Sequence, residues 1–309
     1  MRDFSGTRVL VTGGGGFVGT RTVRALAKRR ANVRVLDLAA PPGLADLPCE
    51  VVIGDVGDPE TVALACDGCE RVVHLAVLPL GRANAAVTEA FEANVRGSFN
   101  VFRAAGENGV KRVVYASASS AYGPTNAVPI REEHPLRPNA FYPASKAAGE
   151  LLLRGLAGTY GFSFAILRYM NVYGPGQRAG VVPAVTRALL ANERPKLTGD
   201  GSLAFDFVHI EDCALANVLA LESDIDGEDF NVGCGDATSL NELVAVLSSI
   251  VGVHVEPEYS GETVAAPPRV GDPSKSRDLL GFEAQIPLHE GLAGVVDELR
   301  AAEPVGAPD

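Results

Sequence analysis

The amino-acid sequence predicts a doubly wound α/β fold, in which helices cover both faces of a parallel sheet. Apolar runs alternate with helix-like segments through the first half of the chain, and this alternation is typical of parallel sheets. Several runs, such as residues 113–115, are apolar without interruption, as strands are when both faces are covered. The 309 residues are enough for one large domain or two coupled lobes.

The elements follow in order from these runs. Residues 9–11 are the apolar centre of a strand expected at 8–12, and the glycines after it precede a helix at 17–30. The same reasoning predicts further strands at 33–37, 51–53, 71–76, 112–117 and 163–168. The helices between these strands are expected at 59–66, 86–107 and 143–159.

The pattern loosens after residue 171. A helix is expected at 181–192, and residues 230–233 resemble a late strand that returns to the main sheet. We therefore expect a first domain of residues 1–172, with 204–234 returning to it. A smaller mixed α/β lobe would comprise 173–203 and 235–309. Residues 301–309 are expected to form a tail without regular structure.

A glycine-rich run follows the first strand. Gly14, Gly16 and Gly19 fit G-x-G-x-x-G, and Gly13, Gly16 and Gly19 fit the looser G-x-x-G-x-x-G. Glycine lets the backbone turn tightly and approach a pyrophosphate, which the amides at the start of the next helix then face. A flexible turn is the alternative, but the preceding strand favours dinucleotide binding.

The second strand ends in an acidic residue. Asp37 lies 18 residues beyond Gly19, close to the separation of about 20 residues at which a carboxylate meets the adenosine ribose. A negative charge there repels a ribose 2′-phosphate. The sequence therefore predicts NAD rather than NADP.

Tyr142 and Lys146 begin a predicted helix and lie four residues apart, on one face. A phenol with a pKa near 10 is a poor base at neutral pH, but a nearby ammonium favours the phenolate. Tyr142 is therefore a candidate base for a substrate hydroxyl, and Lys146 is its partner. The alternative is that both residues lie on an ordinary surface helix.

The composition excludes several classes of partner. A net charge of −11 disfavours nucleic acid, whose phosphates need a basic surface, and anionic lipid. No apolar stretch reaches the length of about 18 residues that a membrane span needs. We expect a cytoplasmic protein with no membrane partner.

Cysteine and histidine spacings do not predict a metal site. Cys66 and Cys69 form one C-x-x-C, but no second pair completes four ligands, so the five cysteines are expected to be structural thiols. The histidines considered are scattered along the chain: His134, His209, His254 and His289.

With further short motifs, these features resemble an extended short-chain dehydrogenase/reductase of the NAD-dependent nucleotide-sugar epimerase/dehydratase family. The resemblance runs over nearly all of the chain. The segments that carry it are 12–19, Asp37, 54–56, 74–76, 94–97, 117–123, Tyr142 with Lys146, 168–176, 206–212 and 272–281.

The resemblance implies a Rossmann-type domain that binds NAD. Asp37 would hold the adenosine ribose, Asp55 and Val56 would lie near the adenine, and Phe17 and Val18 near the phosphates. Tyr142 and Lys146 would hold the nicotinamide ribose. The other implied cofactor contacts are Gly13, Gly16, Gly19, Leu75, Ala76, Asn94, Ser117, Tyr169 and Val172.

The resemblance also implies a nucleotide-sugar substrate, most plausibly a UDP-sugar. Asn171 would reach its phosphates, and the 181–192 helix, through Val181 and Val182, its base. Phe207 and Arg269 are further implied substrate contacts.

The chain departs from the family pattern in the diphosphate clamp. Phe205 stands where the family has an arginine before Asp206. The loop ahead of Asp272 looks shortened, which leaves Arg269 as the arginine available there. Loss of guanidinium contacts would weaken diphosphate binding.

Two further departures bear on the reaction. Ala118 occupies the position of a family serine or threonine that binds the reacting oxygen, so Ser119 or, alternatively, Ser117 is expected to replace it. Members that eliminate water carry an Asp-Glu pair where this chain has Ser119 and Ser120. Epimerisation at C4, which needs no such pair, fits best.

Two alternatives stay open. One is a sugar or alcohol dehydrogenase that releases NADH, and the other is an NAD-binding partner protein with impaired catalysis. The resemblance further implies a homodimer through the helices at 86–107 and 143–159.

Overall fold

A seven-stranded parallel sheet organises the computed structural model, which describes residues 3–263 and 266–302. Its strand order is β11-β6-β5-β4-β1-β2-β3. The strands are β1 (Arg8–Thr12), β2 (Asn32–Asp37), β3 (Glu50–Ile53), β4 (Arg71–His74), β5 (Arg112–Ala118), β6 (Ser163–Tyr169) and β11 (Glu228–Val232). Every pairing is parallel, so the predicted fold class is confirmed.

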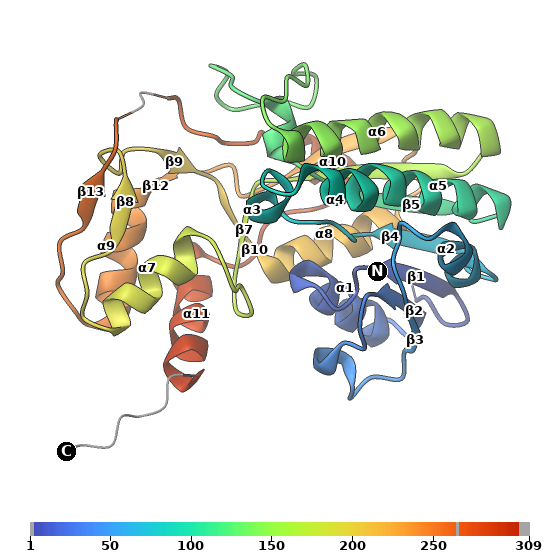
Figure 1. Cartoon of the computed structure of the whole chain (residues 1–309), viewed down its shortest axis with the longest axis horizontal. Coiled ribbons are helices and arrows are strands. Elements are labelled where there is room, and N and C mark those ends of the chain that lie inside the picture. Colours follow the sequence, from blue (N-terminus) through green and yellow to red (C-terminus); the bar gives the residue numbers. More distant parts are fainter. Residues whose placement is uncertain (1–2, 264–265, 303–309) are drawn as a thin grey trace.

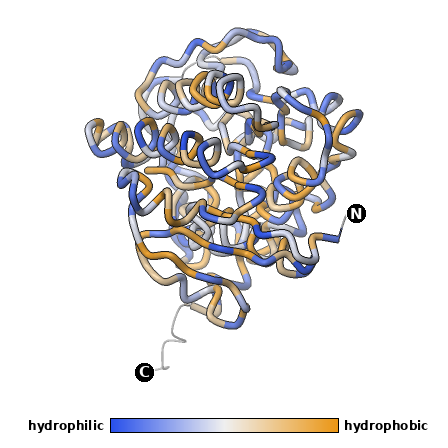
Figure 2. The backbone as a smooth tube through the Cα atoms, turned by 90° about the vertical axis from the view of Figure 1, so that its right-hand side faces the viewer, coloured by the Kyte–Doolittle hydropathy of each residue, from blue (hydrophilic) through white to orange (hydrophobic). Residues whose placement is uncertain are grey.

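Helices cover both faces of this sheet (Figure 1). α1 (Phe17–Lys28) and α8 (Ile210–Glu222) bury Val23, Leu26 and Ala216 against one face. α2 (Pro59–Cys66), α5 (Gly97–Glu107) and α6 (Phe141–Tyr160) cover the other face. Hydrophilic and hydrophobic residues alternate along the outer helices, as expected for helices with one buried side (Figure 2).

The segment expected as one helix at 86–107 has three parts. α4 (Val87–Ala90) leads into a π-helical turn at Phe91–Arg96 and then into α5. The wide turn contains Asn94, whose side chain binds the backbone N–H and C=O of Leu78 at 2.7 and 3.1 Å and Ser145 at 3.2 Å. These tertiary hydrogen bonds accompany the departure from α-helical geometry that the sequence did not predict. A separate short helix, α3 (Leu80–Ala83), precedes this segment.

β4 ends two residues earlier than the sequence predicted. The Leu75 N–H still donates to the Thr12 carbonyl, but the Ala76 N–H donates to the Thr12 hydroxyl instead of to a backbone carbonyl. The loop after β4 is thereby held against the end of β1.

The later elements form a smaller, separate core. α7 (Val181–Leu190), α9 (Leu240–Val251) and α11 (Leu288–Ala302) pack around Leu189, Leu243 and Val296. Three two-stranded pairs join this region: β7 (Asn171–Tyr173) with β10 (Phe207–His209), β8 (Lys196–Thr198) with β13 (Glu258–Ser260), and β9 (Ala204–Phe205) with β12 (Thr238–Ser239). α10 (Ser274–Leu280) lies against β11.

The late strand predicted at 230–233 is confirmed as β11, which begins at Glu228 and pairs with β6 in the main sheet. The division into a 1–172 domain and a smaller lobe stays a prediction. Ala301 and Ala302 belong to α11, contrary to the expected tail, and 303–309 lie outside the described residues. No helix within the described ranges has the length and apolarity to span a membrane.

One glycine tests the packing of α6 on β5. A Cβ at Gly149 would overlap the hydroxyl of Tyr115, which is buried beneath the helix, whereas a Cβ at Gly155, also in α6, meets nothing within 4 Å. We expect Gly149→Ala to lower the free energy of unfolding by about 1–3 kcal/mol through overpacking. Gly155→Ala is expected to raise it by roughly 0.5–1 kcal/mol, because alanine favours a helix. Urea denaturation of both variants checks this, and equal effects would contradict the packing described.

Candidate active site

The glycine loop, residues 13–19, joins β1 to α1 with almost no space for side chains. Gly13 has φ +68°, and a Cβ there would lie 2.7 Å from the Ala76 nitrogen. A Cβ at Gly19 would overlap the Gly13 carbonyl, and the Gly16 N–H donates to that same carbonyl at 3.0 Å. α1 then starts at Phe17 with no side-chain cap on its first amides. This cradle suits a pyrophosphate.

Two acidic residues lie at the neighbouring strand ends. One carboxylate oxygen of Asp37 accepts the Gly15 N–H and the other the Leu38 N–H, both at 2.8 Å. Asp55 follows β3, is exposed, and accepts the Gly57 N–H. The strand ends thus bring the glycine loop and Asp37 together, as a ribose contact requires. These residues fit a dinucleotide.

Several predicted cofactor contacts have structural roles through their side chains. The Asn94 side chain is hydrogen-bonded to Leu78 and Ser145, and its predicted contact with NAD stays a prediction. The Tyr169 hydroxyl donates to Asn217 of α8 at 2.7 Å, on the far side of β6 from α6. Val56 packs in the core.

Leu75 and Ala76 lie against the glycine loop, and Ala76 is half-buried; their predicted contact with the cofactor stays a prediction. Val172 is half-buried in β7.

Tyr142 lies in the first turn of α6, where its N–H donates to Asn84 at 3.0 Å. Lys146 is one turn further on and 4% exposed. Its ammonium donates to the Ala116 carbonyl of β5 at 2.8 Å and lies 5.0 Å from the centre of the Tyr115 ring. The pair therefore stands beside the carboxyl end of β5.

The electrostatics of this pair differ from the prediction. Burial raises the pKa of Tyr142 to about 12 and lowers that of Lys146 to about 7. The expected lowering of the Tyr142 pKa by Lys146 is therefore absent in this structure, because desolvation opposes both charged forms.

The serines after β5 differ in their surroundings. The Ser117 hydroxyl is buried and donates to Glu150 at 2.5 Å, so in this structure it is engaged within the protein, and its predicted role in the site stays a prediction. Ser119 is buried in the 3-10 turn Ser119–Tyr122. The Ser120 hydroxyl, which the sequence analysis gave no role in binding, is buried without a hydrogen-bond partner in the part of the chain that is described.

The predicted substrate contacts are spread across the β7–β10 pair and the smaller core. Asn171 is half-buried and stands opposite Phe207 in the ladder. Val182 and Phe207 belong to the smaller core, and Val181 packs partly on it. The reason is that α7 needs an apolar face to dock on α9 and α11. The predicted contacts of these three residues with the substrate stay a prediction.

Arg269 lies opposite Phe205 in an isolated bridge and is half-buried. Its guanidinium donates to the Gly123 carbonyl at 3.2 Å, and burial lowers its pKa.

A buried ion pair was missed by the sequence analysis. Glu150 of α6 and Arg168 of β6 approach to 2.7 Å with both side chains almost wholly inaccessible. Glu150 lies four residues after Lys146, so the same helical spacing that singled out Tyr142 and Lys146 could have found it.

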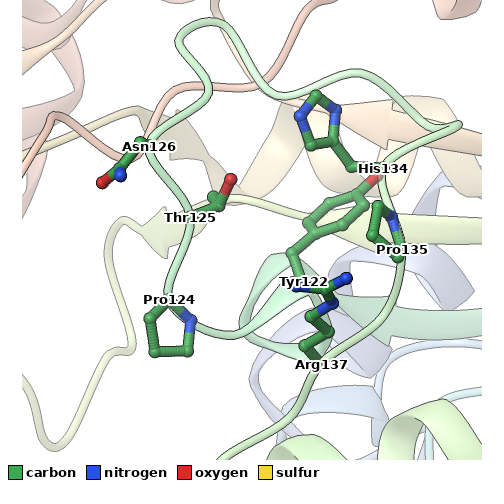
Figure 3. Close-up of a pocket in the computed structure, with 7 residues that line it drawn as sticks. All are labelled: Tyr122, Pro124, Thr125, Asn126, His134, Pro135 and Arg137. Carbon is green, nitrogen blue, oxygen red and sulfur yellow. The ribbon is translucent and has the colours of Figure 1, made fainter.

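A pocket of about 420 Å³ opens beside the end of β5 (Figure 3). Its lining residues are Tyr122, Pro124, Thr125, Asn126, His134, Pro135 and Arg137. The Tyr122 hydroxyl is already bound to Asn231 and Arg168. Within the described ranges, no three His, Cys, Asp or Glu side chains gather as a metal site.

Fold and site together define a dinucleotide-binding α/β protein with a Tyr-x-x-x-Lys pair at its sheet edge. The model of the NAD dependent epimerase/dehydratase family matches residues 9–233, and the chain belongs to this family. NAD, the predicted cofactor, is the nucleotide by which the family is named.

Known proteins resemble the chain over almost its whole length. The UDP-glucose 4-epimerase of Mycolicibacterium smegmatis is 34% identical, covering 95% of this chain and 98% of its own length. The Thermotoga maritima UDP-glucose 4-epimerase, solved with UDP-glucose, superposes with a TM-score of 0.89 at 30% identity, covering 96% and 99%. The Thermus thermophilus UDP-glucose 4-epimerase, solved with NAD, gives a TM-score of 0.86 at 30% identity, covering 96% and 100%.

The glycine loop can be tested directly. In Gly19→Ala the new methyl group overlaps the Gly13 carbonyl, so we expect NAD affinity to fall at least about tenfold, equivalent to about 1.4 kcal/mol. Gly158→Ala, on open helix surface, is the control. Calorimetric titration with NAD measures both, and unchanged binding by a folded Gly19→Ala variant would exclude this cradle as the cofactor site.

Proposed function

We propose that the protein is an NAD-dependent nucleotide-sugar epimerase that inverts C4 of a UDP-hexose or UDP-hexuronic acid. The observation that carries the reaction type is the pairing of Tyr142 and Lys146 beside a turn with serines at positions 119 and 120. Water elimination needs an additional acid and base, and that turn supplies no carboxyl group. Oxidation and re-reduction at one carbon needs one proton acceptor.

Tyr142 acts in this proposal as the base that removes the hydroxyl proton. It returns a proton after the 4-keto sugar has rotated to present its opposite face. NAD supplies, when bound, reversible acceptance of a hydride from the carbinol carbon, and the same NAD is retained through both halves. Because the pKa of Tyr142 is about 12 in the structure, the phenolate requires positive charge close by. Lys146, one turn away, is the cation that the chain provides.

Asn171 and Arg269 are the proposed contacts to the substrate diphosphate. The Arg269 guanidinium is half-buried and donates to the Gly123 carbonyl. Among the described residues it forms no ion pair with a carboxylate. Ser119 is the proposed ligand of the reacting oxygen, since Ala118 has no hydroxyl. These roles rest on the residues' positions and on the relatives' substrates.

A second candidate function is a dehydrogenase that releases NADH. Phe205, in place of an arginine, favours it because a weaker diphosphate clamp suits a different alcohol. Net growth or loss of nicotinamide absorbance during turnover distinguishes it from epimerisation, in which NAD is regenerated.

Tyr142→Phe tests the proposed base. We expect it to lower the epimerisation rate by at least about 100-fold, because phenylalanine cannot accept the proton, while NAD stays bound. Proton NMR of UDP-, dTDP- and GDP-sugars incubated with each variant measures the rate. Tyr160→Phe, at the exposed end of the same helix, is the control. Unchanged turnover in Tyr142→Phe would exclude this mechanism, and no turnover in any variant would favour a non-catalytic NAD-binding protein.

We also propose a homodimer formed through α4, α5 and α6. Large apolar side chains are exposed on these helices and on the π-helical turn between α4 and α5, among them Phe91, Phe99 and Leu151, the last 69% exposed. An exposed group of this kind is characteristic of a protein–protein contact. The proposed location is the cytoplasm, because all five cysteines are free thiols and such thiols persist in reducing compartments.

Leu151→Glu tests the dimer. A charge placed on the proposed contact should convert the protein to a monomer, because it would be buried without a partner. Leu279→Glu on α10, also at an exposed leucine, should leave the dimer intact. Light scattering gives both masses, and a monomeric parent protein would refute the assembly.

A further inference from the structure

Glu150 presents a buried carboxylate one helical turn from Lys146, on the same face of α6. Its side chain is 1% exposed. One oxygen accepts the Ser117 hydroxyl at 2.5 Å and the Arg168 Nε–H at 3.0 Å, and the other accepts the Arg168 Nη2–H at 2.7 Å. Such charge-assisted contacts fix a carboxylate in place.

The cation that stabilises Glu150 is itself held by several neighbours. Arg168 also pairs with Asp229 at 2.6 Å, and Asp229 pairs in turn with Arg154 at 2.7 Å. The remaining Arg168 nitrogen donates to the Tyr122 hydroxyl and the Glu132 carbonyl. Two carboxylates therefore share Arg168, and Glu150 is the one on the helix that carries Lys146.

The other titratable groups facing Lys146 are neutral at physiological pH. Burial and the nearby Lys146 charge lower the pKa of His74 in β4 to about 3, so its imidazole is uncharged. Burial raises the pKa of Tyr115 in β5 well above its ordinary range and that of Tyr142 to about 12. Among these described elements, β4, β5 and α6, Glu150 is therefore the acidic group whose charge favours the ammonium form of Lys146.

We propose that Glu150 is a positioning residue: fixed by Arg168 and Ser117, its carboxylate favours the protonated form of the buried Lys146. The benefit to catalysis rests on the proposed function, in which the Lys146 charge favours the Tyr142 phenolate. The effect on Lys146 itself does not depend on that function.

The same arrangement accounts for Ser117. This serine stands at the end of β5 beside the predicted catalytic turn, yet its hydroxyl is directed to Glu150. In β5, Ala116 accepts the hydrogen bond from Lys146, and the next residue, Ser117, donates to Glu150. The strand thus contacts both members of the proposed Lys146–Glu150 pair.

Nuclear magnetic resonance of lysine labelled with carbon-13 at Cε tests the proposal without an activity assay. The chain has five lysines, which makes the spectrum simple: Lys28, Lys111, Lys146, Lys196 and Lys275. The Lys146 signal is assigned by its loss in Lys146→Met. In Glu150→Gln we expect the titration midpoint of Lys146 to fall by about one pH unit or more, because an opposite charge has been removed.

Asp229→Asn is the matched control, since it removes the other carboxylate from Arg168. Its Lys146 midpoint should stay within a few tenths of a pH unit of the parent value, as expected for a carboxylate that does not face the ammonium. An unchanged midpoint in Glu150→Gln, or an equal fall in both variants, would overturn the proposal. Should Glu150→Gln fail to fold, Glu150→Asp retains the charge but withdraws it by one methylene. A fall of the Lys146 midpoint relative to the parent protein, by less than about one pH unit, would support the proposal, and an unchanged midpoint would overturn it.

The pH dependence of turnover supplies a second readout. Loss of the Lys146 proton should reduce the rate as pH rises, so the alkaline limb is expected to move to lower pH in Glu150→Gln and not in Asp229→Asn. A shifted NMR midpoint in a protein with no epimerase activity would uphold the Glu150 role and refute the proposed function. If Glu150→Gln shifts the Lys146 NMR midpoint but leaves the alkaline limb of the pH–rate profile unchanged, Glu150 affects the protonation of Lys146 only. That result would overturn the proposed benefit to catalysis.

Discussion

The hydrogen bond from Lys146 to the Ala116 carbonyl is the contact on which the site depends. It brings a side chain of α6 beneath the end of β5, and with it the first helical turn that carries Tyr142. Gly149 allows the approach, since any Cβ there would meet the Tyr115 hydroxyl. The glycine loop, Asp37 and the Tyr142–Lys146 pair lie at the carboxyl ends of β1, β2 and β5 in one parallel sheet, the edge where ligands of such sheets bind.

Burying these charged groups has an energetic cost that the structure offsets with partners. Lys146 is almost inaccessible to water, so its ammonium is stabilised by a carbonyl, an aromatic face and the carboxylate of Glu150. Glu150 in turn is paired with Arg168, and the pair is completed by Asp229 and Arg154. A buried pair of this kind contributes little net stability, but removing one partner is costly. The network is best understood as fixing charge and position at the sheet edge.

The sequence predicted the architecture well because its signals are local. Unbroken apolar runs defined the strands, and the glycine loop, Asp37 and the Tyr142–Lys146 spacing each rest on short-range patterns. What it missed depends on tertiary contacts. Asn94 lies in a π-helical turn where it holds Leu78, Tyr169 is directed to Asn217, and Ser117 is directed to Glu150. The pKa of Tyr142 was expected to be lowered, but desolvation, which no spacing reveals, raises it.

Inversion through a transient ketone predicts which hydrogen the product carries at C4. In the proposed reaction that hydrogen would leave C4 as hydride for the retained NAD and return from it without exchange with water, so a UDP-sugar epimerised in deuterium oxide with no added NAD should retain protium at C4. Proton NMR of the purified product measures this. Full protium at the inverted carbon is the result expected, whereas deuterium at C4, or product that accumulates together with free NADH, would contradict the account.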